Sequence, residues 1–162
     1  MTPKVLGRKA SEVFKMKITR RQLKYLIREV ITSGIGYTAL VLDPESQNML
    51  MQYAPPGWKP HAHHMTLISP RDQKGVRLPG RFLGSPASIT VTGIVADDRV
   101  IAAVIDPSSS ILPMIGPTFP HVTIATNPAA EGKPYMSNQL DPMSAQPVAP
   151  LTLMGTIQEI MQ

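Results

Sequence analysis

Apolar residues first recur at helical spacing between residues 18 and 31. Thr19 is placed to cap a helix there, and Gln22 holds the reciprocal position of a capping box. The apolar positions, which share one helical face opposite Arg and Lys, are Leu23, Leu26, Ile27, Val30 and Ile31. The pattern predicts an N-terminal amphipathic helix that ends at Gly34. Its apolar face could pack on its own domain or on another subunit, or serve a membrane-surface or nucleic-acid arm.

From Tyr37 the pattern changes to short apolar runs that are typical of β-strands. Asp43-Pro44-Glu45 has the form of a helix start and predicts a short helix to about Tyr53. The turn-forming residues 96–99 predict a hairpin. The expected strands cover residues 37–42, 64–68, 89–95, 100–105, 121–125 and 151–160.

Two connections, residues 106–120 and 127–150, are long and rich in proline. Loops of that length are uncommon in a compact domain unless they serve a binding site, so we expect a ligand beneath them. The whole pattern indicates an α+β protein in two parts. A basic tail and the amphipathic helix occupy residues 1–32, and a folded domain of five to six strands occupies residues 33–162.

Composition narrows the class of protein. Hydrophobic residues make up 43% of the 162 residues and charged residues 17%, which is typical of a globular chain. The chain has no cysteine, so disulfides, thiol nucleophiles and thiolate metal sites are excluded. No apolar run approaches the roughly 20 residues that cross a bilayer, and no signal-peptide pattern opens the chain. We therefore expect a soluble, cytoplasmic protein.

The net charge of +5 is unevenly distributed. Residues 1–32 carry nine Lys or Arg against two Glu, a net of +7, and the other 130 residues carry a net of −2. A near-neutral domain without a broad basic face disfavours binding of long RNA. One short stretch is basic and could hold a second phosphate or be a solvated loop: Arg71, Lys74, Arg77 and Arg81.

Two of the expected strands begin with the same pattern, His64-Met65-Thr66-Leu67 and His121-Val122-Thr123-Ile124. Residues two apart in a strand share a face. In each segment the histidine and threonine therefore point to one side and the apolar residues to the other, into a core. If the two strands lie side by side, two imidazoles and two hydroxyls converge on one groove.

Such a set suits phosphoryl transfer without a metal ion. The unperturbed pKa of histidine, about 6.5, allows one imidazole to accept a proton while another donates one near neutral pH. We expect His64 and His121 in these roles. The hydroxyls of Thr66 and Thr123 can donate hydrogen bonds to phosphate oxygens, where charge develops in the transition state.

On these two motifs, 57 residues apart, the chain resembles the 2H phosphoesterase superfamily, which is named for two H-x-[T/S]-x motifs on paired strands. The resemblance covers about 125 residues, from Tyr37 to Glu159. It looks most like the phage-encoded members that destroy the cyclic oligonucleotide signals of bacterial CBASS immunity. The features that favour this branch are the proline before His121, the segments Gly132-Lys133-Pro134 and Ser137-Asn138, and the basic leader.

The resemblance implies two antiparallel sheets in pseudo-symmetric lobes around a central groove. It also implies an enzyme that needs no metal or other cofactor and acts in the host cytoplasm. The best function is cleavage of 3′–5′ phosphodiesters in cyclic di- or trinucleotides, by attack of the adjacent 2′-hydroxyl. Two alternatives stay open: a 2′,3′-cyclic phosphodiesterase for RNA ends of the tRNA-repair type, and a non-enzymatic module that binds cyclic nucleotides or RNA. The N-terminal helix could also join subunits into a homo-oligomer.

Several further side chains are candidates for substrate binding. Tyr37 and Trp58 could stack on a base or pack in the core or at its rim, and Arg71 could bind a phosphate. His61 and His63 next to His64 raise the idea of a metal cluster. No carboxylate or cysteine lies nearby at ligand spacing, and adjacent strand residues point to opposite faces. We therefore expect no metal site, with His61 and His63 at the rim of the groove or in solvent.

Overall fold

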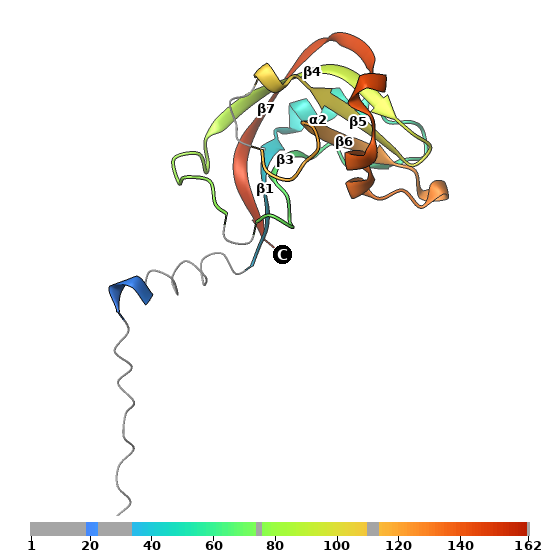
Figure 1. Ribbon diagram of the computed structural model, residues 1–162. Coiled ribbons are helices and arrows are strands. Elements are labelled where there is room, and N and C mark those ends of the chain that lie inside the picture. The colour runs from blue at the N-terminus through green and yellow to red at the C-terminus, as the bar shows by residue number, and fades with distance from the viewer. Residues whose placement is uncertain (1–18, 23–33, 74–75, 110–113, 162) are drawn as a thin grey trace, which may run out of the picture.

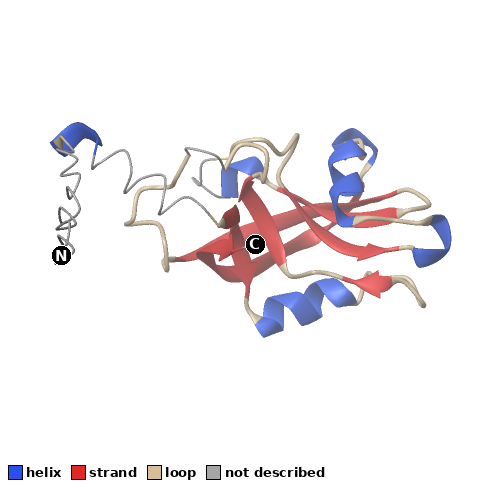
Figure 2. Ribbon diagram, turned by 90° about the horizontal axis from the view of Figure 1, so that it is seen from below, coloured by secondary structure: helices blue, strands red, loops and turns tan. Residues whose placement is uncertain are grey.

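The computed structural model describes residues 19–22, 34–73, 76–109 and 114–161 (Figure 1). Within these residues no helix is both long enough and apolar enough to cross a membrane. The described residues form seven strands that belong to one antiparallel sheet, with short helical segments around it (Figure 2). The strands are β1 (Ile35–Leu42), β2 (Lys59–Pro60), β3 (His64–Ile68), β4 (Pro86–Ala96), β5 (Val100–Ile105), β6 (His121–Thr126) and β7 (Gln146–Met161).

The order of the strands is β2-β6-β3-β1-β7-β4-β5, and β5 also pairs with β6, so that the sheet closes on itself. On one side of the β3–β6 pair lie β1 and then β7, and on the other side lie β5 and then β4. The predicted α+β class is confirmed in this coarse sense. The expected separation into two sheets is not seen, because β4 and β7 pair with each other from Pro86↔Thr156 to Ile94↔Gln146. This long pairing joins the two halves into one sheet.

In the described part of the chain the longest α-helix is α2 (Pro44–Met51), with eight residues. As predicted, Asp43 caps it: the Ser46 N–H donates a hydrogen bond to the Asp43 carboxylate at 2.7 Å. Leu50 of α2 is fully buried in the main core. The remaining helical segments are 3₁₀ turns: η1 (Pro107–Ser109), η2 (Pro128–Ala130), η3 (Pro134–Gln139) and η4 (Pro142–Ser144).

The predicted capping box is present between Thr19 and Gln22. The Thr19 N–H donates to Gln22 Oε1 at 3.0 Å, and the Gln22 N–H donates to Thr19 Oγ1 at 3.1 Å. Residues 20–22 are helical. The predicted apolar stripe, Leu23 to Ile31, lies outside the described residues, and the domain boundary near residue 33 stays a prediction.

The alternation of β3 sets the orientation of the first motif. Met65 and Leu67 are 1% and 0% exposed and belong to the main hydrophobic core, while His64 and Thr66 are only half-buried. On β6, Val122 and Ile124 are fully buried in the same core. The motif histidines and threonines therefore lie on the face of the sheet that points away from this core.

Candidate active site

A cavity of about 490 Å³ lies over β3 and β6, and all four motif side chains line it: His64, Thr66, His121 and Thr123. The two motifs are 57 residues apart in the sequence and meet here because β3 and β6 are antiparallel neighbours. Both long connections contribute to the lining, the first through Pro117 and the second through η3. The other lining residues are Tyr37, Pro60, His61, His63, Ser69, Pro70, Pro134, Tyr135, Ser137 and Asn138.

His64 is a neutral imidazole in this setting. Burial, followed by the positive charges that His63, His121 and His61 would carry, lowers the pKa of His64 from 6.5 to about 4. The ring of Tyr37 lies beside it, with 5.0 Å between ring centroids. His64 Nδ1 is 3.3 Å from His63 Nδ1, so that one of these two nitrogens donates and the other accepts. At neutral pH His64 is therefore in the form that can accept a proton.

His121 is fixed through one of its nitrogens. Its Nδ1 lies 2.8 Å from the carbonyl oxygen of Phe119, and the Phe119 ring lies 4.5 Å from the imidazole, centroid to centroid. A carbonyl can only accept, so Nδ1 carries a proton and Nε2 is the nitrogen that can gain or lose one. Burial lowers the pKa of His121, and the bond to Phe119 opposes that shift.

Ser137 of η3 connects the two side chains of the second motif. Its Oγ is 2.8 Å from His121 Nε2, 2.8 Å from Thr123 Oγ1 and 2.7 Å from the carbonyl oxygen of Pro134. When His121 is neutral, the Ser137 hydroxyl donates to Nε2. When His121 is protonated, Nε2 donates to Ser137, whose proton turns to Pro134. One hydroxyl rotation thus accommodates both protonation states of His121.

Ser137 is 1% exposed, and sequence reasoning did not select it as a site residue. The segment Ser137-Asn138 was visible as part of the resemblance, and it lies in the connection expected to cover a ligand. No periodic pattern in that connection shows which of its side chains points at β6. Only the tertiary position of η3 does so.

The segment before β3 is held against the second motif. The His61 and Ala62 N–H groups each donate at 2.8 Å, to the carbonyls of Ile124 and Thr123 respectively. Ala62 has a φ of 39°, an uncommon backbone conformation for a residue with a side chain. His63 lies before the strand begins, so the expected alternation of adjacent side chains does not apply, and the His63 and His64 rings contact each other.

His61 and His63 both line the cavity, but the His61 ring is not directed at His63 or His64 as that of a shared metal ligand would be. His61 Nε2 bonds instead to Thr126 Oγ1 at 2.9 Å. Among the residues that the structure describes, no three His, Asp or Glu side chains are grouped so that they could hold a metal ion.

The other sequence candidates divide between the cavity and the rest of the surface. Tyr37 lines the cavity. Trp58 does not, and packs half-buried against the main core. Arg71 is exposed and is not part of the lining. The remaining members of the basic stretch are engaged elsewhere or not described: Arg77 pairs with Glu159, Arg81 lies over the Phe82 ring, and Lys74 is outside the described residues.

No protein-family model matches this sequence, and no curated protein is similar enough to it to be called a relative. The function of the chain is therefore indicated by the residues of the cavity and their geometry.

Proposed function

We propose that this protein is a metal-independent phosphodiesterase of the 2H type, with His64, Thr66, His121 and Thr123 as its catalytic residues. The observation that carries the proposal is that both motif histidines line one cavity in complementary settings. His64 is held neutral, and His121 is anchored at Nδ1 with Nε2 as its exchangeable position.

The first chemical step is transfer within the substrate. His64 accepts the proton of a ribose 2′-hydroxyl, whose oxygen forms a new bond to the adjacent phosphorus. The bond from phosphorus to the 5′-oxygen breaks, and His121 Nε2 donates a proton to that oxygen. The products are a 2′,3′-cyclic phosphate and a free 5′-hydroxyl. Each positioned proton transfer is typically worth roughly 10²–10⁴-fold in rate.

Bound phosphate changes the protonation of the site in the direction that this step needs. An anion in the cavity raises the pKa of both histidines. His64, whose pKa starts from about 4, remains the proton acceptor, and His121 is the residue that gains a second proton as substrate binds. The hydroxyls of Thr66 and Thr123 then donate to the non-bridging oxygens. Ser137 Oγ is hydrogen-bonded to both Thr123 Oγ1 and His121 Nε2, at 2.8 Å each. These two bonds must break when Thr123 and His121 bind the substrate, and Ser137 can then bind the substrate as well.

The size and lining of the cavity favour a small nucleotide substrate. A volume of about 490 Å³ is within the range of roughly 300–1,000 Å³ that is usual for small-molecule sites. The ring of Tyr37 next to His64 is placed to stack on a base, which is worth about 1–3 kcal/mol. We therefore propose cyclic di- or trinucleotides as substrates, in keeping with a phage countermeasure to host immunity in the host cytoplasm. The N-terminal helix would serve assembly or location.

One observation favours a second candidate, a binding module without turnover. Ser137 occupies His121 Nε2, so in this conformation the nitrogen needed for proton donation already has a partner. A protein that only sequesters a cyclic nucleotide would have no need to release that bond.

Incubation of the protein in EDTA with cyclic dinucleotides, cyclic trinucleotides and 2′,3′-cyclic mononucleotides distinguishes these functions. Product analysis by chromatography and ³¹P NMR should show cleavage of a cyclic oligonucleotide. Cleavage restricted to the 2′,3′-cyclic mononucleotides would point to RNA-end repair. Stoichiometric binding without any product would establish the binding module and contradict the enzyme.

A further inference from the structure

A second hollow adjoins the first and is lined by basic side chains. Its volume is about 760 Å³, and it shares His61, Pro134 and Tyr135 with the motif cavity. Three cations line it against one carboxylate: Lys59, Arg99 and Lys133 against Glu131. None of these residues has a role in the chemistry proposed above.

The strand register explains why these cations gather. Lys59 of β2 pairs with Thr126, the last residue of β6. Thr126 pairs on its other side with Val100 of β5, which directly follows Arg99. Lys59 and Arg99 thus flank the same end of β6. Thr126 lies three residues beyond Thr123, a span of about 10 Å along a strand.

Lys133 is held beside them by a close backbone approach. The Asn127 N–H donates to the Arg99 carbonyl at 2.8 Å, and the Gly132 N–H donates to the Asn127 carbonyl at 2.9 Å. A Cβ at position 132 would overlap the Arg99 carbonyl oxygen, so only glycine allows the turn to pack this tightly. The position of Lys133 therefore follows from the turn that precedes it.

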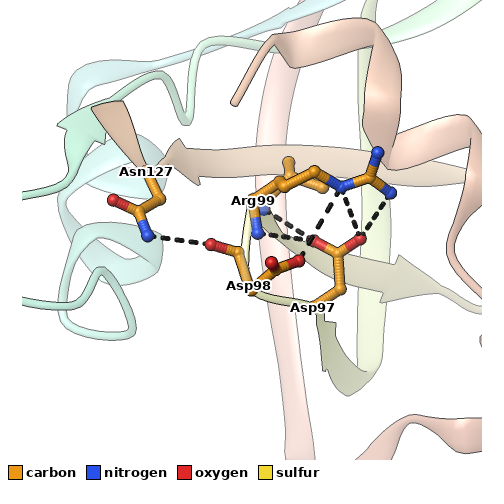
Figure 3. A network of polar contacts seen from close by, with 5 residues as sticks. Asp97, Asp98, Arg99 and Asn127 are labelled. Atoms are coloured by element: carbon orange, nitrogen blue, oxygen red, sulfur yellow. Dashed lines mark hydrogen bonds and ion pairs between the residues drawn. The ribbon is translucent and has the colours of Figure 1, made fainter. Parts of the chain in front are cut away.

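The charge of Arg99 is already balanced. Its guanidinium lies 2.8 Å from Asp97 and 3.8 Å from Asp98. The Asp98 carbonyl accepts a hydrogen bond from the Asn127 side chain, and the contacts of these four residues can be followed in Figure 3. By contrast, Lys59 and Lys133 are exposed, and neither forms an ion pair within the described residues. The cations available to a ligand in this hollow are the two lysines.

We propose that Lys59 and Lys133 form a subsite for a second phosphate of the substrate. This inference rests on the proposed function and deepens it, because it selects substrates with at least two phosphates over a 2′,3′-cyclic mononucleotide. One phosphodiester lies over the two motifs and the nucleoside crosses Pro134 and Tyr135, which line both hollows. The next phosphate then lies between the lysines, where charge-assisted hydrogen bonds are strong.

Binding of uncleavable ligands tests the subsite separately from turnover. The probes are the 2′-deoxy dinucleotide dApA without a terminal phosphate, and the same dinucleotide with a phosphate at its 5′ or its 3′ end. These ligands lack the attacking 2′-hydroxyl, so titration calorimetry measures Kd alone. We expect a terminal phosphate at one of the two ends to tighten binding to the wild-type protein about tenfold, equivalent to about 1.4 kcal/mol.

The double variant Lys59→Ala/Lys133→Ala should bind all three ligands equally, and circular dichroism should show it folded because both side chains are exposed. Arg71→Ala/Arg81→Ala, which removes two positive charges outside both hollows, is the matched control and should keep the tenfold preference. Equal or absent binding of the three ligands by the wild-type protein would overturn the subsite, as would a preference that survives in the double variant. A lysine-dependent preference without cleavage of any ribonucleotide would keep the subsite and refute the phosphodiesterase.

Discussion

Met65 and Val122, the middle residues of the two histidine motifs, are paired directly across β3 and β6. Because the strands are antiparallel, His64 lies across from Thr123, and Thr66 lies across from His121. Both middle side chains are buried in the core, at 1% and 0% exposure. This single pair therefore aligns two distant segments and turns their polar residues to the same face.

The pairing predicts that Met65 stabilises the two motif strands from the core side of the sheet. Met65→Ala should lower the free energy of unfolding by about 2–5 kcal/mol, because it leaves a cavity under both motifs. Met65→Leu, which conserves volume, should cost less than about 1.5 kcal/mol. Urea denaturation of the two variants provides the measurement. An alanine variant as stable as the leucine variant would mean that this pair does not hold the strands together.

Ser137 should contribute measurably to stability although it lies in a 3₁₀ turn. Ser137→Ala leaves His121 Nε2 and Thr123 Oγ1 without their shared partner, and a buried unpaired polar group costs about 1–3 kcal/mol. The matched control is Ser144→Ala, whose exposed hydroxyl donates only to the Asp141 carbonyl. It should change the free energy of unfolding by less than about 0.5 kcal/mol. Equal effects of the two substitutions in denaturation experiments would argue against the Ser137 network.

The first motif strand was predictable in full, and the arrangement around it was not. The alternation of polar and apolar residues from His64 to Leu67 predicts both the strand and the face on which His64 lies, because side chains two apart in a strand share a face. The start of β7 was missed by five residues, since Pro147 and Pro150 are unusual in a strand that pairs along its length. The pairing with β4 that merges the two expected sheets runs from Leu151 to Thr156, inside the predicted strand, and the early start adds only the pairs of Pro147 and Gln146. No local pattern in β4 or β7 indicates which strand lies next to it.

Side chains that enter the site from loops were harder to identify than those on strands. Ser137 reaches His121 through the tertiary position of η3, which no local pattern encodes. Trp58 follows a proline-rich loop in the sequence and yet packs against the core. The direction of a strand side chain can be predicted because it repeats every two positions. The side chains of a loop have no such periodicity.

The low pKa of His64 predicts a loss of stability in acid. Its pKa is about 4 in the folded chain and 6.5 in the unfolded chain, so the unfolded chain binds more protons between these values. The free energy of unfolding should therefore rise with pH from about 4 to 6.5 and level off above. The contribution of His64 is about 3 kcal/mol, from 1.36 kcal/mol per pKa unit. Denaturation of His64→Asn across this range should show a smaller rise, and an unchanged slope would refute the shift.

Tyr37 should help to keep His64 neutral. Its ring lies 5.0 Å from the imidazole and shields it from water. Tyr37→Ala should raise the pKa of His64 toward 6.5, whereas Tyr37→Phe, which keeps the ring, should leave it near 4. NMR titration of the histidine Cε1 protons measures both. If the pKa of His64 were the same in Tyr37→Ala as in the wild type, Tyr37 would not contribute to lowering it.

The most direct measurement is kcat/KM in EDTA, for a substrate identified from the panel of cyclic nucleotides, of the wild type and of His64→Ala and His121→Ala. Each histidine variant should remain folded and lose at least about 100-fold, because each lacks one proton-transfer partner. Thr66→Ala and Thr123→Ala should lose less, and Thr152→Ala, an exposed threonine on β7, should lose nothing. Full activity in either histidine variant, or wild-type activity that EDTA abolishes and zinc restores, would contradict metal-free catalysis by two histidines.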